Sequence, residues 1–284
     1  QLASLNIQAV GFTDGIDRAQ IAAAAGEAVG KGRLGLVMLE TPANPTNGLV
    51  DLAAVAEVVA DVARRQGPRP PIAVDNTLLG PIYQTPLKHG ADLAIYSLTK
   101  YAGGHSDLVA GGVSGNDEMV RRIRLLRGAL GTQLDPHSCW MLLRSLETLA
   151  IRTERANDNA RKVAAYLRDH RKIRAVHYLG FLEAGDPRKP VFDRQCVQPG
   201  STFSFEVQGG EAEAFAMLDR LEIMKLAVSL GGTETLISHP ASTTHSGVPR
   251  ALREEIGLTD ALIRISVGIE NADDLIADLE NALG

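Results

Sequence analysis

The chain has 284 residues, of which 45% are apolar and 22% are charged, with 29 Lys and Arg against 34 Asp and Glu. This balance is typical of folded soluble domains and excludes an intrinsically disordered chain. The length predicts one large domain or two, with an extensive core. Because the net charge of −5 is modest and the basic residues are scattered, we expect neither nucleic acid nor a membrane surface as a partner.

Cys139 and Cys196 are the two cysteines of the chain, and they stand far apart. They fit a reducing compartment and exclude a disulfide scaffold, and we expect both to be small core residues. No apolar run approaches the ~18 residues that a membrane span needs, and no signal-peptide pattern opens the chain. We therefore expect a cytoplasmic protein.

Short aliphatic runs alternate with helical stretches in the first half of the chain. Most of the runs are apolar at nearly every position, which is typical of parallel strands buried on both faces. Between two of them, residues 52–62 place apolar side chains at helical spacing, with Asp51 as the expected N-cap. The sequence therefore predicts a doubly wound, mostly parallel α/β domain over residues 1–135. The runs expected to be strands are residues 7–12, 34–39, 72–74, 93–96 and 108–113.

Residues 136–170 predict a long helix that connects this domain to a second one. Its polar middle, residues 152–162, suggests that it passes from one packing environment to another. Residues 171–284 then predict a smaller α/β domain with antiparallel pairing, with strands at 201–207, 226–230, 234–240 and 261–268, helices at 211–221 and 272–283, and loops at 183–190 and 242–250. The apolar stripe expected along the connecting helix comprises Trp140, Leu143, Leu146, Val163 and Leu167.

Polar residues follow three of the predicted strands, at the edge where open parallel sheets bind ligands. Glu40 begins the polar segment ETPANPTNG, Asp75 follows the next strand, and Ser97, Thr99 and Lys100 follow the third. Alone, each is more often a turn former or a solvated side chain. Together, hydroxyls beside glycines suit a phosphate, and a partly buried lysine suits Schiff-base chemistry.

Four segments resemble, in the right order, a known enzyme family: LETPANPTNGLVDL, the block from residues 73 to 112, VSLGGTETLISHPASTTHSG and LIRISVGIEN. The family is that of the pyridoxal-phosphate-dependent (PLP-dependent) enzymes of cysteine and methionine metabolism, the trans-sulfuration enzymes. The resemblance covers residue 34 to the C-terminus. It implies the aspartate-aminotransferase-like fold (fold type I), and a homotetramer built from dimers that share active sites.

The resemblance also implies which residues hold pyridoxal 5′-phosphate. Lys100 would bind the cofactor covalently, and the Asp75 carboxylate would hold the proton on the pyridine nitrogen, which makes the ring an electron sink. Ser97 and Thr99 match the hydroxyls that bind the phosphate. Asn44 matches the polar group near the phenolic oxygen of the ring.

A second group of matching residues concerns the substrate, a small amino acid. Arg264 matches the arginine that grips the α-carboxylate with a two-pronged hydrogen bond. Ser229 and Thr244 match positions that line the substrate pocket. The seven histidines show no metal-ligand spacing, so we expect no metal site, and His239 and His245 are expected to be loop residues or to lie behind the site.

The resemblance implies γ-elimination from a sulfur-containing amino acid, as in methionine γ-lyase. Two alternatives stay open: γ-replacement on an O-acylhomoserine, as in cystathionine γ-synthase or the sulfhydrylases, and a catalytically silent member. Lys100, Asp75 and Arg264 are all present, which disfavours the silent member. The glycines lack the G-x-G-x-x-G arrangement of a nicotinamide-dependent oxidoreductase.

The family's stacking aromatic, its phosphate-binding glycine loop and the groups given by the neighbouring subunit all precede the lysine region, in a part to which nothing here corresponds. We therefore expect that the chain begins inside a domain, and that these 284 residues alone bind the cofactor weakly.

Overall fold

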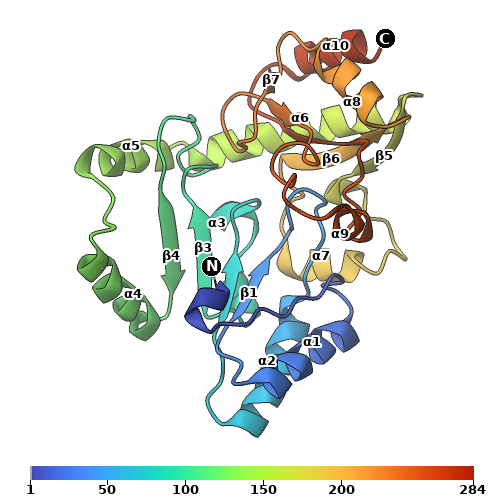
Figure 1. Cartoon of the computed structure of the whole chain (residues 1–284). Coiled ribbons are helices and arrows are strands. Elements are labelled where there is room, and N and C mark those ends of the chain that lie inside the picture. The colour runs from blue at the N-terminus through green and yellow to red at the C-terminus, as the bar shows by residue number, and fades with distance from the viewer. Residues whose placement is uncertain (1) are drawn as a thin grey trace.

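The computed structural model describes residues 2–284, which fold around two β-sheets (Figure 1). The first sheet consists, in spatial order, of β1 (Val37–Glu40), β2 (Ile72–Asp75), β3 (Leu93–Ser97) and β4 (Gly111–Gly115). The second sheet consists of β5 (Ile173–His177), β6 (Thr202–Val207), β9 (Leu262–Ser266), β8 (Leu236–Ser238) and β7 (Lys225–Leu226).

Strands β1, β2 and β3 are parallel, as the sequence predicts. Their register pairs Glu40 with Asp75, and Asp75 with Ile95, so the polar ends of the strands lie side by side. Strand β4 instead pairs with β3 in the antiparallel direction, with Gly111 opposite Ser97. The prediction of a buried parallel strand at 108–113 is therefore wrong in direction, and Val113 is 38% exposed.

Helix α2 (Leu52–Gln66) confirms the predicted helix and its cap. The Asp51 side chain accepts hydrogen bonds from the backbone N–H groups of Ala53 and Ala54, both at 3.1 Å. The apolar face of α2 packs with Ile21 of α1 (Arg18–Lys31) and with residues of β1 and β2. Helix α2 thus covers the first sheet with side chains that recur at helical spacing: Leu52, Val55, Val58, Val59 and Val62.

Residues 7–12 do not form the predicted strand. They lie outside any sheet, and Ile7 is 49% exposed. The backbone N–H of Ile7 donates to Leu2 O, in the short 3₁₀ turn Leu2–Leu5, at 3.1 Å. An apolar run becomes a strand only when a neighbouring strand supplies backbone partners. The next run, at 34–39, shortens to β1, where Met38 is 53% exposed.

The predicted connecting helix is two helices, α5 (Pro136–Leu146) and α6 (Leu149–Asp169). Val163 and Leu167 of α6 are fully buried, whereas Trp140, Leu143 and Leu146 of α5 are exposed. The predicted apolar stripe therefore does not pack into one hydrophobic core. The polar middle lies between two packing environments within α6, because Leu149 packs with Tyr101 whereas Val163 and Leu167 belong to the core of the second sheet. Much of this polar middle is buried. Its buried members are Arg152, Thr153, Asn157 and Asn159.

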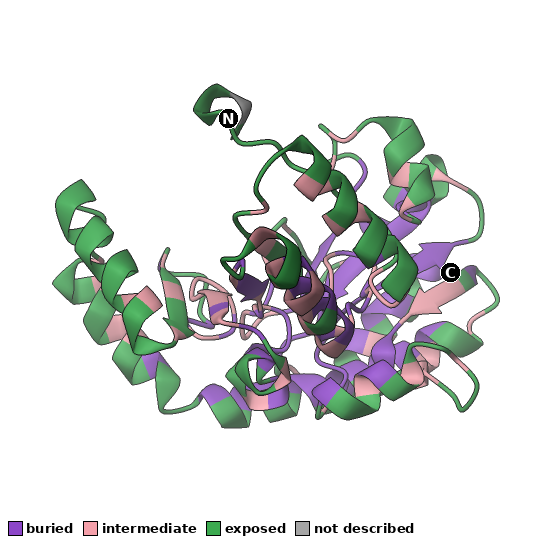
Figure 2. Ribbon diagram, turned by 90° about the horizontal axis from the view of Figure 1, so that it is seen from below, coloured by how far each residue is buried: buried purple, intermediate pink, exposed green. Residues whose placement is uncertain are grey.

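Helix α4 (Asp117–Leu130) has no buried residue, and it projects with β4 and α5 from one side of the molecule (Figures 1 and 2). Cys139 on α5 is exposed, which corrects its prediction as a core residue, while Cys196 is buried. Within residues 2–284, no helix combines the length and apolarity needed to cross a membrane.

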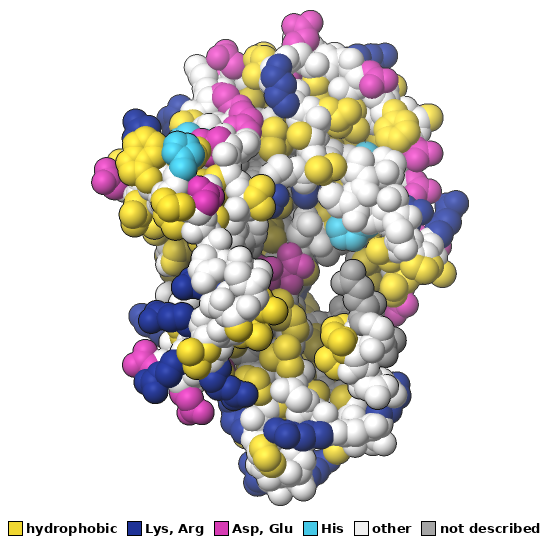
Figure 3. All heavy atoms as spheres, turned by 60° about the vertical axis from the view of Figure 1, so that its left-hand side comes forward, with side chains coloured by type: hydrophobic (Ala, Val, Ile, Leu, Met, Phe, Trp, Pro, Cys, Tyr) yellow, Lys and Arg dark blue, Asp and Glu magenta, His cyan; other side chains and the backbone are white. Residues whose placement is uncertain are grey.

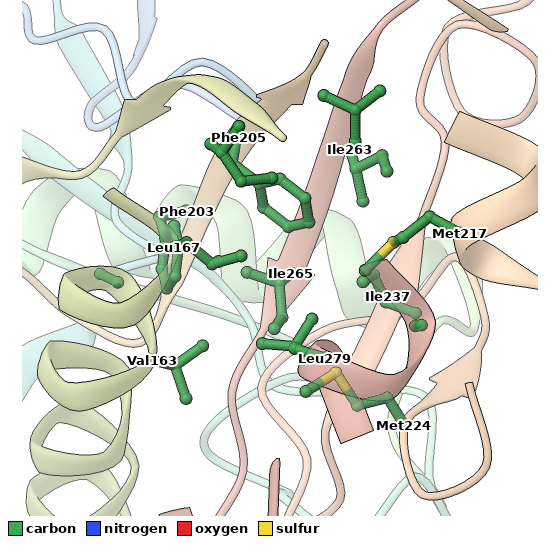
Figure 4. Packing of buried hydrophobic residues seen from close by; sticks show 14 of the residues in the cluster. Val163, Leu167, Phe203, Phe205, Met217, Met224, Ile237, Ile263, Ile265 and Leu279 are labelled. Carbon is green, nitrogen blue, oxygen red and sulfur yellow. The ribbon is translucent and has the colours of Figure 1, made fainter. Parts of the chain in front are cut away.

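The largest core lies in the second sheet. Strands β6 and β9 place alternate side chains, among them Phe203, Phe205, Ile263 and Ile265, against α6, α8 (Glu211–Leu218) and α10 (Ala272–Leu283) (Figure 4). The remaining helices are α3 (Gly80–Tyr83), α7 (Lys189–Gln195) and α9 (Arg250–Glu255), with 3₁₀ turns at Pro86–His89 and Leu179–Phe181.

The alternation of strand side chains directs the other face of the second sheet toward the first. Ser204, between Phe203 and Phe205, donates its hydroxyl to Pro45 O at 2.6 Å. Arg264, between Ile263 and Ile265, faces the same way. The segment after β1 is thereby joined to the second sheet.

Candidate active site

Lys100 lies in the turn that follows β3. Its backbone N–H donates to Ser97 O at 3.1 Å, and its Nζ donates to Ser229 Oγ at 3.0 Å. Burial, and then the charge of Arg264, lower the pKa of Lys100. Both effects favour the neutral amine, which is the nucleophilic form that imine chemistry requires.

Arg152 of α6 holds this turn in place by hydrogen bonds. Its guanidinium donates to Tyr101 O and Ser145 O, both at 2.9 Å, and its Nε donates to Thr148 Oγ1 at 3.1 Å. The guanidinium packs so closely that a Cβ at Gly104, where φ is +70°, would overlap it. The turn therefore needs glycine at this position both for its backbone conformation and for space.

Asp75, at the end of β2, is held by Thr77. Both the backbone N–H and the hydroxyl of Thr77 donate to Asp75 Oδ1, at 3.0 and 2.6 Å. The same hydroxyl accepts the backbone N–H of Ser97 at 2.8 Å. No hydrogen bond to Asp75 Oδ2 or to the Ser97 hydroxyl occurs within the described residues, so both are available to a ligand.

Glu40, at the end of β1, is the register partner of Asp75. Solvent reaches its side chain, but the protein atoms around the carboxyl, together with the charge of Asp75, raise the pKa of Glu40 to about 7. The backbone N–H of Asn44 donates to Glu40 Oε1 at 3.4 Å and acts in the opposite direction. The carboxyl end of the first sheet thus carries two acidic groups side by side.

Arg264 reaches this end of the sheet from β9 and is 1% exposed. Its Nη1 donates to Asn44 Oδ1 at 3.2 Å, and its Nη2 donates to Val228 O and Ser229 O, both at 2.7 Å. Its Nε is buried without a partner, and no carboxylate in residues 2–284 pairs with the guanidinium. A buried cation with a free donor suits an anionic ligand such as a substrate carboxylate.

Two residues, Thr99 and Thr244, fit their predicted binding roles less directly. The Thr99 hydroxyl both accepts from Ala110 N–H at 3.0 Å and donates to Ala110 O at 3.2 Å, so it must leave that carbonyl before it can donate to a phosphate. Thr244 is exposed in the turn at 242–250, where its hydroxyl shares a hydrogen bond with His245 Nδ1 at 2.8 Å. Burial and the charge of Arg264 lower the pKa of His245.

Hydrogen bonds link Lys100 to Ser229, Ser229 to Arg264, Arg264 to Asn44 and Asn44 to Glu40, which is the register partner of Asp75, so these groups lie together. Figure 3 shows a hollow in the molecular surface, with an acidic side chain deep inside it and a histidine nearby. The donor set matches the parts of pyridoxal 5′-phosphate: an amine for its aldehyde, a carboxylate oxygen for its ring nitrogen and a hydroxyl for its phosphate. The unpartnered Asp75 Oδ2 and the unpartnered Ser97 hydroxyl are the observations that carry this fit.

A family model described as "Cys/Met metabolism PLP-dependent enzyme" matches residues 3–284. The chain belongs to this family. Over 250 residues it is 44% identical to the L-methionine gamma-lyase of Fusobacterium nucleatum subsp. polymorphum, covering 87% of this chain and 62% of that protein. Over 248 residues it is 40% identical to the cystathionine gamma-lyase of Bacillus subtilis, covering 87% and 63%.

Among solved structures, the chain resembles the cystathionine gamma synthase of Xanthomonas oryzae pv. oryzae, in complex with aminoacrylate and cysteine. The TM-score is 0.87 at 36% identity, with 99% of this chain and 70% of that one covered. This similarity confirms the predicted fold class. The chain spans just over three-fifths of the length of the two curated relatives.

Three residues that support the site are not among those singled out from the sequence. Thr77 holds Asp75, Arg152 holds the turn of Lys100, and Tyr101, which is 8% exposed, hydrogen-bonds Ser201 and Thr202 beneath that turn. Thr77 and Tyr101 belong to the segment that carries the family resemblance, two and one residues from predicted site residues. Arg152 is distant in the sequence and had no local signal.

Proposed function

We propose that the full-length protein is a PLP-dependent γ-lyase that cleaves the C–S bond of a sulfur-containing amino acid such as methionine. One observation carries the proposal. Ser229 contacts both the Lys100 amine, through Oγ at 3.0 Å, and the Arg264 guanidinium, through its carbonyl at 2.7 Å. A single residue thus brings the amine close to the group that suits an α-carboxylate, and an amino-acid substrate needs both groups.

The cofactor, when bound, withdraws electrons from the substrate Cα and so makes its proton removable. Lys100 would hold it, Asp75 Oδ2 would keep its ring nitrogen protonated, and the Ser97 hydroxyl would donate to its phosphate. Arg264 would bind the substrate carboxylate and turn Cα toward the Lys100 amine. Once the substrate's amine has displaced it from the cofactor, Lys100, whose lowered pKa favours the neutral form, would take the Cα proton and move protons along the substrate.

Elimination without an added nucleophile gives a balanced reaction, in which methionine and water yield α-ketobutyrate, methanethiol and ammonia. The 44% identity to an L-methionine gamma-lyase supports this branch. The likeness to a cystathionine gamma synthase keeps γ-replacement on an O-acylhomoserine as the second candidate. A silent protein is disfavoured because Lys100, Asp75 and Arg264 are all present and share one hollow.

The two candidates are separated by supplying substrates to the full-length protein with pyridoxal 5′-phosphate. We expect α-ketobutyrate, methanethiol and ammonia from methionine alone. No product from methionine, together with product from an O-acylhomoserine and a thiol, would assign the protein to the replacement branch. No product from either would leave the silent member.

We also propose that the protein acts as a cytoplasmic homotetramer built from dimers that share active sites, with no nucleic-acid or membrane partner. Large exposed apolar side chains on the projecting helices support self-association, because monomers seldom expose so many together. These residues are Leu125, Leu126 and Leu130 of α4, at 60–70% exposure, and Trp140 and Leu143 of α5, at 57% and 67%.

A further inference from the structure

The hydroxyl of Thr77 joins two parts of the site that are far apart in the sequence. It donates to Asp75 Oδ1 at 2.6 Å and accepts from the backbone N–H of Ser97 at 2.8 Å. Ser97 in turn accepts the backbone N–H of Lys100 at 3.1 Å. A continuous set of hydrogen bonds therefore runs from the acidic residue of β2, through Thr77, to the turn that presents the lysine.

The bonds to Asp75 are asymmetric, and this asymmetry has a chemical consequence. Both Thr77 donors reach Oδ1, and Oδ2 has no partner within the described chain. A carboxylate with no such restraint rotates readily about its terminal torsion, which is broad and two-fold. Two donors on one oxygen fix the plane of the carboxylate, so that the same oxygen always faces the ligand.

A neighbouring acidic group adds a reason for this restraint. Glu40 lies opposite Asp75 across the parallel β1–β2 register, and the charge of Asp75 is one of the causes that raise the pKa of Glu40. A freely rotating Asp75 carboxylate would turn away from Glu40. The hydroxyl of Thr77 opposes this by a charge-assisted hydrogen bond, the stronger class of such bonds.

We propose that Thr77 is a positioning residue that orients Asp75 Oδ2 toward the pyridine nitrogen of the cofactor and fixes its spacing from Lys100. The inference rests on the proposed function, because it assumes that pyridoxal 5′-phosphate binds at this hollow. Thr77 itself touches no reacting atom, and its effect passes through Asp75 and the turn after Ser97.

The test compares Thr77→Val, which keeps the branched shape and removes the hydroxyl, with Thr77→Ser, which keeps the hydroxyl, both in the full-length protein. Affinity for pyridoxal 5′-phosphate is measured by equilibrium titration, followed by its visible absorbance, and kcat and KM are measured separately. We expect Thr77→Val to bind the cofactor about tenfold more weakly and to lose kcat with little change in KM, because one charge-assisted bond is removed. Thr77→Ser should stay within about twofold of the wild type.

A matched control exists in the second sheet. The Thr235 hydroxyl donates to Glu270 Oε2 at 2.9 Å and accepts the Gly268 N–H at 2.9 Å, which is the bonding pattern of Thr77 without contact to the predicted site residues. Thr235→Val should lower the melting temperature and leave cofactor affinity unchanged. If Thr77→Val does not fold, Thr77→Ala is compared with Thr77→Ser in its place.

Three results would overturn the inference: unchanged cofactor affinity in Thr77→Val, a loss in Thr77→Ser as large as in Thr77→Val, or an equal loss in Thr235→Val. Failure of the proposed function has a different signature. In that case the wild type itself shows no lysine-dependent visible absorbance, and Lys100→Ala matches it.

Discussion

The two sheets of the molecule differ in how completely they are covered. Every residue of β6 and β9 is buried, whereas β1 and β4 each expose residues along their length and α4 buries none. The less covered sheet carries Lys100 and Asp75, and the covered one contributes Arg264 across the hollow. The residues predicted to hold the cofactor and the main packing core thus lie in different sheets, and the following substitutions test that separation from the largest expected effect to the smallest.

Lys100→Ala should abolish turnover and the visible absorbance of the bound cofactor in the full-length protein, while leaving the folded state intact. No other amine hydrogen-bonds Ser229 within residues 2–284. Circular dichroism and cofactor absorbance check the two halves of this expectation. Cofactor that borohydride still attaches to the variant would contradict the assignment.

Phe205→Ala should destabilise the chain by about 3–5 kcal/mol, because it opens a cavity where the side chain is fully buried. Val113→Ala on β4, a site 38% exposed, should cost less than about 1 kcal/mol. Denaturant titrations of the two variants compare the sheets directly. Equal losses would show that the first sheet is as important for stability as the second.

Arg264→Ala should lower kcat/KM by roughly 10–150-fold, since a hydrogen bond to a charged group contributes about 1.5–3 kcal/mol. Arg264→Lys should recover only part of the loss, because an ammonium cannot form the two-pronged contact. Cofactor titration serves as the control. A variant that loses the cofactor and keeps its kcat/KM would place Arg264 at the cofactor instead.

Glu40 should make stability depend on pH. Its pKa is about 7 in the folded chain against an ordinary 4.5, so between these values the folded state binds more protons than the unfolded state. Stability therefore falls as pH rises through this window and levels off above it. In Glu40→Gln, the difference between melting temperatures below about pH 5 and above about pH 8 should shrink; an unchanged difference would exclude Glu40 as its source.

Leu126→Ser on α4 should change the folding free energy of an isolated chain by no more than about 0.5 kcal/mol, because the side chain is 60% exposed. It should instead weaken self-association, as measured by sedimentation of the full-length protein. Leu226→Ser on β7, which is 63% exposed and lies outside the projecting helices, is the comparison variant. Unaltered association in Leu126→Ser would argue that this surface is not an interface.

Periodicity predicted those elements whose burial is determined locally. Helix α2 with its Asp51 cap and the strands β2, β3, β6 and β9 follow from side-chain pattern and capping alone. The elements that depend on distant partners were predicted wrongly. Residues 7–12 have no neighbouring strand to pair with, and β4 runs antiparallel to β3 instead of parallel. The apolar side chains of α5 have the same sequence pattern as the buried stripe of α6, but they are exposed.

The site was predicted in a similar way. Lys100, Asp75, Asn44, Ser229 and Arg264 come from sequence blocks and lie close together in the structure, and their assigned roles stay predictions. The hydrogen bonds that fix these side chains could not be read from the sequence motifs. Thr99 engages Ala110 through the β3–β4 pairing, and the long reach of Arg152 depends on how α6 crosses beneath the turn.

The buried Arg152 affects local unfolding of the turn that carries Lys100. Its guanidinium donates hydrogen bonds to the carbonyls of Tyr101 and Ser145. The backbone N–H groups of Gly103 and Gly104 donate to the carbonyls of Leu98 and Lys100. The turn consequently has little freedom to fray by itself and should exchange its amide hydrogens together with the N-terminal end of α6, as one cooperative unit. The turn that carries Lys100 is therefore attached to the long helix α6, so the mobility of this turn depends on that helix.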